Sequence, residues 1–280
     1  MEQKIIESIT KKLLAIEQEY QVKVLYAVES GSRAWGFESQ DSDYDIRFIY
    51  AHEKNWYLNI LPKRDVIEEP ITGDFDYSGW DLRKTLFLLH KSNPVLFEWL
   101  RSPQVYVKEP YSYSVLQALA QEYFSPLSSV YHYLHMARGN YQRYLQTDKV
   151  KIKKYFYVLR PLLGCIWIER YNESPPIEFK TLTAGPSDPA LSKVLEELLQ
   201  RKKSGTELNL EPPNAILKAF IEHQMSRFET LIHTFDPRKK PNQDFLEQGF
   251  LRILEHSFSP GNPREIPGEI NNAPSPKVKE

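Results

Sequence analysis

The chain begins with alternating apolar and polar positions that predict a helix followed by a strand. Residues 3–19 place apolar side chains at intervals of three and four, as an amphipathic helix requires. Residues 22–28 (VKVLYAV) form a short apolar, β-branched run that ends at Glu29. The tripeptide 30–32 (Ser-Gly-Ser) follows, and its glycine permits a sharp change of backbone direction. We therefore expect a helix, a strand and a turn.

A second strand is predicted by the alternation of residues 43–50 (DYDIRFIY). Successive side chains of a strand point to opposite faces of its sheet, so Asp43 and Asp45 must share one face. The other face carries Ile46 and Phe48, which are typical of a buried surface. Two carboxylates are therefore expected close together on the sheet.

Residues 65–80 predict a third strand, although a proline and a glycine interrupt the pattern and leave its ends open. From residue 81 the pattern becomes helical, with Asp81 as the expected cap of one helix and Asn93 as the cap of the next. Residues 104–107 (QVYV) are expected to add an edge strand. We therefore expect two or three main strands in this part of the chain.

The rest of the chain reads as helix almost to residue 255, with no repeat period. Strands followed by helices indicate an α+β fold. We expect a small mixed sheet flanked by helices in residues 1–110 and a helical domain in residues 111–257. Residues 258–280, rich in proline and glycine, are expected to form a disordered tail.

Composition excludes several classes of protein. The chain has 280 residues, of which 41% are hydrophobic and 26% charged, as in an ordinary globular protein. Its longest apolar stretch, residues 155–168, is shorter than the ~20 residues of a membrane-spanning helix and contains Arg160 and Pro161. The charged amphipathic start does not resemble a secretory signal, so we expect a cytoplasmic protein without membrane contact. The single cysteine, Cys165, is expected to be a core residue.

Charge is distributed unevenly along the chain. Residues 1–120 carry 14 basic and 18 acidic side chains, whereas residues 121–170 carry eight basic and three acidic ones. The first part therefore has a net charge of −4 and the second of +5. This arrangement is expected where carboxylates bind cations and a separate surface attracts phosphates.

The segment from Glu29 to Arg47 carries the most specific chemistry. A Gly-Ser turn at Gly31 and Ser32 can present backbone N–H groups and a hydroxyl to a phosphate. Asp43 and Asp45 would repel each other on one strand face, and Mg²⁺, which prefers oxygen ligands and substrate phosphates, would relieve that repulsion. A triphosphate between the loop and a metal ion is the interpretation we favour over a plain turn and two solvated aspartates.

These residues resemble a known family. The motifs GSRAWGF and SDYDIRFIY are similar to the Gly-Ser loop and Asp-x-Asp strand of the polymerase-beta-like nucleotidyltransferases. The later segments DLRKTLFLLHKSNPVLFEWLRSPQVY and KIKKYFYVLRPLLGCIWIE resemble the branch of predicted nucleotidyltransferases that includes proteins associated with RNA repair. The resemblance covers about residues 20–170, and it identifies a branch without identifying a substrate.

The resemblance implies a role for each matching residue. Gly31 and Ser32 would hold the phosphates of a nucleoside triphosphate. Asp43 and Asp45 would bind two Mg²⁺ ions, with Mn²⁺ as an alternative, for an in-line displacement at the α-phosphate.

A third carboxylate on the next strand is usual in this family. We choose Asp76, which would complete the metal site and accept the proton of the attacking hydroxyl. Asp74 lies on the same strand face, and Asp81 is close by, although its position fits a helix cap better.

Three basic residues are further candidates for nucleotide binding. Arg33 directly follows the phosphate loop, where a surface salt bridge is the competing interpretation. Lys154 and Arg160 lie in a basic segment interleaved with tyrosines, which suits a triphosphate or a nucleic acid. A solvated helix face explains this segment about equally well.

The combined prediction is an Mg²⁺-dependent nucleotidyltransferase that moves a nucleoside monophosphate from an NTP to an acceptor hydroxyl and releases pyrophosphate. The resemblance favours RNA as the acceptor and leaves a protein hydroxyl, a small molecule, the choice of NTP and the oligomeric state open. A non-catalytic nucleotide- or RNA-binding module is the alternative from another class. An antibiotic-modifying nucleotidyltransferase is a third possibility, which the basic segment disfavours.

Overall fold

The computed structural model describes residues 2–39, 41–184, 189–204, 210–236 and 241–259. Two of its helical segments are short 3₁₀ turns, here η1 and η2. In chain order the elements are α1 (Glu2–Tyr20), β1 (Val22–Glu29), α2 (Gly31–Ala34), β2 (Tyr44–His52), η1 (Lys54–Leu58), β3 (Val66–Glu68), β4 (Phe75–Asp81), α3 (Leu82–His90), α4 (Pro94–Leu100), β5 (Val105–Lys108), α5 (Pro110–Tyr123), α6 (Pro126–Tyr144), β6 (Val150–Lys151), α7 (Ile152–Tyr171), α8 (Phe179–Thr183), α9 (Pro189–Lys203), β7 (Leu210–Glu211), α10 (Ala215–Leu231), η2 (Ile232–Thr234) and α11 (Gln243–Ser257).

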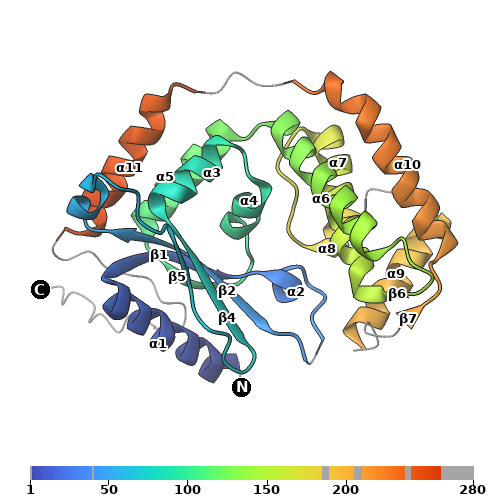
Figure 1. Cartoon of the computed structure of the whole chain (residues 1–280), viewed down its shortest axis with the longest axis horizontal. Helices are drawn as coiled ribbons and strands as arrows, with labels where there is room; N and C mark the ends of the chain where they lie inside the picture. The colour runs from blue at the N-terminus through green and yellow to red at the C-terminus, as the bar shows by residue number, and fades with distance from the viewer. Residues whose placement is uncertain (1, 40, 185–188, 205–209, 237–240, 260–280) are drawn as a thin grey trace, which may run out of the picture.

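A mixed five-stranded sheet forms the centre of the first half, in the order β3-β4-β2-β1-β5. β2 and β4 run parallel, and the other neighbouring strands run antiparallel. Helices flank this sheet and continue through the second half of the chain (Figure 1). The predicted α+β class with a small mixed sheet is confirmed.

The number of strands differs from the prediction. The helix, the first two strands and the edge strand lie where the sequence places them, but residues 65–80 form two strands, β3 and β4, instead of one. These two pair antiparallel, and Gly73 adopts a φ of +61° in the turn between them. A positive φ costs glycine little, so the chain folds back here and the interrupted pattern becomes a hairpin.

The two faces of the sheet are covered by different helices. On one face, Ile9, Leu13 and Ile16 of α1 pack with the buried side chains Ile46 and Phe48 of β2. The opposite face contributes to a larger apolar cluster shared with the helices of the second half. β2 therefore turns Ile46 and Phe48 toward α1 and Asp45 toward the helical half, so the predicted alternation of its two faces is confirmed.

The predicted caps begin the helices that follow the sheet. Oδ1 of Asp81 accepts the backbone N–H of Arg83 at 2.8 Å, and Oδ1 of Asn93 accepts that of Val95 at 3.0 Å. The hydroxyl of Tyr57 also donates to Asp81, at 2.8 Å. Asp81 is thus a buried capping residue, which removes it as an alternative to Asp76.

The helical second half does not form a separate layer. α6 and α7 pack together along their lengths, whereas α11 packs on α5 and α3 beside the sheet (Figure 1). One apolar cluster extends from the sheet through both groups of helices. The predicted boundary at residue 111 coincides with the start of α5 but stays a prediction. A short pair of strands, β6 and β7, was not predicted.

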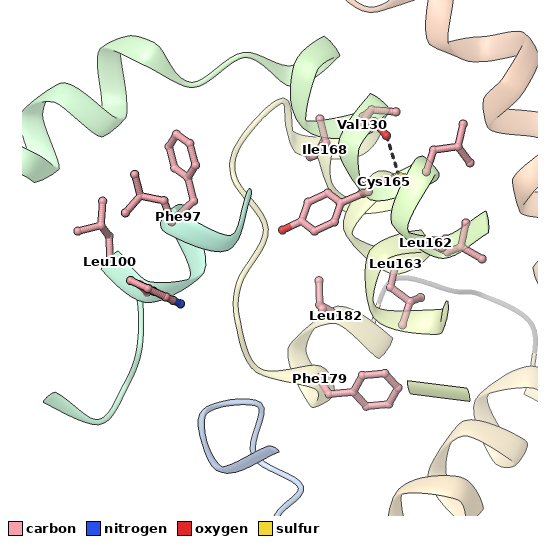
Figure 2. Packing of buried hydrophobic residues seen from close by; sticks show 14 of the residues in the cluster. Phe97, Leu100, Val130, Leu162, Leu163, Cys165, Ile168, Phe179 and Leu182 are labelled. Atoms are coloured by element: carbon pink, nitrogen blue, oxygen red, sulfur yellow. Dashed lines mark hydrogen bonds between the residues drawn. The ribbon is translucent and has the colours of Figure 1, made fainter. Parts of the chain in front are cut away.

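Cys165 lies in the apolar core of the α6–α7 pair, as expected. Figure 2 shows it beside Val130, Leu162 and Ile168, and its thiol donates to the carbonyl of Val130 at 3.8 Å. Burial raises the pKa of the Cys165 thiol far above its ordinary value. The thiol is therefore a packing group and not a nucleophile.

Within the described ranges, no helix is both long enough and apolar enough to cross a membrane. The predicted tail at residues 258–280 lies outside the described residues except for Phe258 and Ser259.

Candidate active site

The turn after β1 brings the Gly-Ser loop against β2. The backbone N–H of Ser30 donates to the carbonyl of Asp45 at 2.8 Å. Gly31 then begins α2 with a φ of +60°, which favours glycine. A Cβ on Gly31 would lie 1.9 Å from Oδ2 of Asp45. Glycine is therefore required here, and the loop and the Asp45 carboxylate are in direct contact.

A cavity of about 250 Å³ opens beside this contact. Half of the predicted site residues line it, from the loop and the start of β2. These four are Gly31, Ser32, Asp43 and Asp45. We call this side the sheet wall, and it also includes Trp35, Phe37, Ser39, Asp41 and Ser42. The other side, the helical wall, comes from α7 and α9, and its residues are Lys153, Phe156, Tyr157 and Lys202.

Asp45 is more enclosed than Asp43, the other aspartate of the Asp-x-Asp pair. It is partly buried on β2, whereas Asp43 lies just before the strand and is exposed. Burial raises the pKa of Asp45, Arg47 opposes this rise, and the charges of Asp76 and Asp43 add to it. Negative charge is therefore costly at Asp45, and a bound cation would stabilise it.

Asp76 lies directly beside Asp45 on the neighbouring parallel strand β4. Nη2 of Arg47 stands between them, 2.9 Å from Oδ1 of Asp45 and 2.7 Å from Oδ2 of Asp76. Asp76 is not among the residues that line the cavity. The structure thus brings the predicted third acid next to Asp45 but places an arginine between the two carboxylates.

The carboxylates can be compared with what Mg²⁺ requires. Across the described residues, no three His, Cys, Asp or Glu side chains are arranged to hold a metal ion. Asp43 and Asp45 both line the cavity, and Mg²⁺ usually takes one or two carboxylates together with water and substrate phosphates. These two acids fit an ion shared with a phosphate, although Arg47 already bonds to one oxygen of Asp45, as it does to one oxygen of Asp76.

Glu29 is a buried acid that the sequence analysis passed over. Only 1% of its surface is exposed, and its Oε1 accepts the backbone N–H of Asp45 at 2.7 Å. The hydroxyl of Tyr106 on β5 donates to its other oxygen. Burial raises the pKa of Glu29 to about 7. A charged residue at the end of an apolar strand was the available signal, and its role is to fix the backbone of Asp45.

Arg33 does not line the cavity. Its guanidinium donates to the backbone carbonyls of Ser42 at 2.7 Å and Asp43 at 3.2 Å, and it lies 3.7 Å from the ring centre of Tyr44. It therefore fixes the chain just before β2 from behind. Because these partners are backbone carbonyls, the position differs from the surface salt bridge considered from the sequence, and a phosphate contact stays a prediction.

Arg160 lies where the two halves of the chain meet. It is buried, pairs with Glu98 of α4 at 3.0 Å, and stacks 3.8 Å from the ring centre of Trp35. Trp35 follows α2 and lines the cavity, but Arg160 does not. The structure therefore places Arg160 behind the Gly-Ser loop, where it holds the loop against the helices.

The lysine of α7 that lines the cavity is not the one that was predicted. Lys153 lines the cavity, whereas Lys154 points toward Tyr144, with its Nζ 4.0 Å from the ring centre. Both belong to the basic segment that the sequence singles out, but the sequence alone does not tell which lysine faces the loop.

Lys202 lines the cavity although no motif in the sequence indicates it. It lies on α9, is 6% exposed, and its Nζ is 3.4 Å from Oγ of Ser39. In the sequence it is one of three consecutive basic residues, Arg201 to Lys203, which is typical of a solvated helix end. Its burial beside the cavity shows instead that a cation is held opposite Asp43 and Asp45.

A mixed sheet with a Gly-Ser loop packed on the aspartate of the next strand defines the polymerase-beta-like nucleotidyltransferase class. A family model described as "RNA repair pathway DNA polymerase beta family" matches residues 5–252. The chain belongs to this family. The suspected resemblance is thereby confirmed.

Two similar proteins give further comparison. The chain is 48% identical over 262 residues to an uncharacterized protein of Bacillus subtilis (strain 168), YcgL, and the match covers 93% of this chain and 99% of that one. A crystal structure of a nucleotidyltransferase-like protein from Exiguobacterium sibiricum matches 88% of this chain and 87% of that chain, at 12% identity and a TM-score of 0.31. A likeness at this score carries no argument, so the class rests on the family match and the site.

Proposed function

We propose that this protein is an Mg²⁺-dependent nucleotidyltransferase that moves a nucleoside monophosphate from an NTP to a hydroxyl of RNA. The family and the fold indicate a function of nucleotidyltransferase type. The observation that carries the proposal is the cavity with Gly31 in contact with Asp45 on one wall and two lysines on the other. RNA is proposed as the acceptor because the family is described by RNA repair and residues 121–170 are basic.

Both walls of the cavity carry groups that suit the triphosphate of an NTP, and the helical wall also suits its nucleobase. Ser32 and the neighbouring backbone would bind phosphate oxygens, and Lys153 and Lys202 would neutralise the β- and γ-phosphates from the opposite side. The partly exposed ring of Tyr157 offers a surface on which a nucleobase could stack. The pyrophosphate would then leave along the lysines.

In the proposed reaction, the acceptor oxygen forms a bond to the α-phosphorus while the bond from this phosphorus to the pyrophosphate oxygen breaks. The proton of the acceptor hydroxyl passes to a carboxylate. Asp76 remains our candidate, through Oδ1, since Arg47 holds Oδ2. Glu29 and Arg33 act by holding the backbone of residues 42–45 in place.

Asp43 and Asp45 would hold the metal ion, with Asp76 as the third ligand if a second ion binds. When bound, Mg²⁺ would neutralise phosphate charge and acidify the acceptor hydroxyl, and Mn²⁺ could replace it. The raised pKa of Asp45 supports this assignment, because the site is poorly suited to an uncompensated carboxylate.

A second candidate function follows from Arg47. Its guanidinium bonds to both Asp45 and Asp76 and so neutralises these acids without a metal. The same arrangement would suit a non-catalytic module that binds a nucleotide with the lysines alone. In that case NTP binding would not require the divalent cation.

The proposal is tested by incubating the purified protein with each α-³²P-labelled NTP and Mg²⁺, with and without mixed cellular RNA. We expect label on RNA with wild type. In Asp45→Asn we expect a loss of at least ~100-fold, because the amide would hold Mg²⁺ less well and the charge of the transition state would be less stabilised. Asp43→Asn should behave similarly.

Asp244→Asn is the control, because Asp244 is an exposed aspartate of α11 that does not line the cavity. It should label RNA like wild type. Full transfer by Asp45→Asn would overturn the assignment. NTP binding without transfer, unaffected by a chelator, would favour the non-catalytic module.

A further inference from the structure

A strip of cations and aromatic rings leads away from the cavity along α6 and α7. We call it the α6–α7 strip and define it as Arg143, Tyr144, Lys154 and Tyr157. Nζ of Lys154 lies 4.0 Å from the ring centre of Tyr144 and 4.7 Å from that of Tyr157. Cζ of Arg143 lies 5.2 Å from the ring centre of Tyr144. Cations and rings therefore alternate along the strip.

The strip begins at the mouth of the cavity. Tyr157 belongs to both, since it lines the cavity and contacts Lys154. Burial raises the pKa of the Tyr157 hydroxyl, and the nearby charge of Asp45 raises it further. Arg143 and Tyr144 are the last residues of α6, which packs along α7 (Figure 1). A ligand on the strip would thus lead to the proposed catalytic acids.

The chain segment that carries the strip is basic. Residues 123–168 contain a single acidic side chain, Asp148, against seven basic ones. Within the described ranges, neither Arg143 nor Lys154 forms a salt bridge, and the side chains of all four strip residues are at least partly exposed. Their charges are therefore available to an anionic partner.

We propose that the α6–α7 strip binds a single strand of RNA and guides the end of that strand into the cavity. Bases of a single strand can stack on Tyr144 and Tyr157, while Arg143 and Lys154 contact the phosphates. A duplex would keep its bases stacked on each other and would gain only the phosphate contacts. The guidance of the end rests on the proposed function, whereas the binding itself does not.

The test measures binding of a fluorescein-labelled 15-nucleotide single-stranded RNA to the full chain by fluorescence anisotropy, without NTP. We expect Tyr144→Ala to raise Kd about 10-fold, since one stacking contact is lost. Tyr144→Phe keeps the ring and should stay within about twofold of wild type. In Arg143→Ala/Lys154→Ala, the slope of log Kd against log salt should fall by about 1.4, as each lost phosphate contact removes ~0.7.

The other end of α7 offers a matched control. Cζ of Arg170 lies 5.4 Å from the ring centre of Tyr171, and both residues are exposed. Arg170→Ala/Tyr171→Ala removes the same chemistry far from the cavity and should leave Kd unchanged. A 15-base-pair RNA duplex should bind more weakly than the single strand.

Several results would contradict the proposal that the α6–α7 strip binds single-stranded RNA. They are a wild-type protein that does not bind the single strand, a duplex bound equally well, and a control variant as damaging as Tyr144→Ala. An equal loss in Tyr144→Phe and Tyr144→Ala would also exclude stacking. These outcomes concern RNA binding alone. If wild type bound RNA but transferred no label to it, the proposed function would be contradicted, whereas RNA binding by the α6–α7 strip would still hold.

Discussion

The two walls of the cavity are built in different ways. The sheet wall comes from one stretch of about fifteen residues, in which the loop after β1 and the start of β2 are brought together by a single turn. The helical wall comes from α7 and α9, and its two lysines, Lys153 and Lys202, are 49 positions apart in the chain. The sheet wall is acidic and the helical wall basic.

The acids and the cations of the cavity are therefore held in place by separate parts of the fold. Glu29 and Arg33 hold the sheet wall through hydrogen bonds to the backbone of residues 42–45. Arg160 joins the walls, because it stacks on Trp35 of one and belongs to α7 of the other. Substitutions can therefore break one wall, the other, or the joint between them.

Gly31→Ala should break the sheet wall with the largest effect. The new Cβ would meet Oδ2 of Asp45 at 1.9 Å, and the φ of +60° adds strain. We expect kcat for transfer to fall at least ~100-fold, since displacement of a reacting group by about 1 Å costs this much. Gly36→Ala is the control, because its φ is +78° but no atom lies within 4 Å of the new Cβ. Equal losses in both variants would mean that strain alone matters.

Arg160→Ala should separate the walls. It leaves Glu98, whose side chain is 13% exposed, without its ion-pair partner at 3.0 Å. Removing one member of a buried pair costs about 3–5 kcal/mol, so we expect a loss of stability of this size in urea unfolding. Arg160→Ala/Glu98→Gln should recover part of that loss. If instead Arg160→Ala left stability unchanged and raised only KM for NTP, Arg160 would be a direct ligand of the nucleotide.

Lys202→Met should weaken the helical wall while keeping much of the side-chain volume. A charge-assisted contact to a phosphate is lost, so KM for NTP should rise about 10-fold with a smaller change in kcat. Lys203→Met is the matched control, because the neighbouring side chain is exposed. A wild-type KM in Lys202→Met would exclude the buried lysine from phosphate binding.

Glu29 should give the smallest effect, on the pH dependence of stability. Its pKa is raised from 4.5 to about 7 by burial, so between these values the folded protein binds more protons than the unfolded one. Stability from this group is therefore present below pH 4.5 and falls as the pH rises through 7, by at most about 1.4 kcal/mol per pH unit. Glu29→Gln should remove this slope in thermal unfolding without Mg²⁺. An unchanged slope would assign it to another group.

The fold was predictable where the apolar pattern was regular. The first helix and the strands β1 and β2 follow directly from periodicity, because each must bury one face. Residues 65–80 were less accessible, since the turn at Gly73 divides a short segment into two strands whose pairing is a matter of tertiary contact. The packing of α11 against α5 could not be predicted either. Periodicity shows that one face of a helix is buried, but it does not show which element covers that face.

The candidate site divides in the same way. Gly31, Ser32, Asp43 and Asp45 were found from local residue types and spacing, and the structure brings all four to one cavity. Among the cations the prediction was poorer, since Lys153 and Lys202 line the cavity while Lys154 and Arg160 do not. Helical periodicity alone does not fix which face of α7 turns toward a loop more than 100 residues earlier in the chain.

The α+β class, the Gly-Ser turn and the pair of aspartates near the next strand could all be predicted from the sequence alone. These features are local, because a strand, a glycine turn and a second strand place their side chains within about fifteen residues. Only tertiary contacts place Arg47 between Asp45 and Asp76 and bury Lys202 on the other side of the cavity from Asp43 and Asp45. Strand register and helix docking set those distances, and both depend on packing between segments that are remote in the chain.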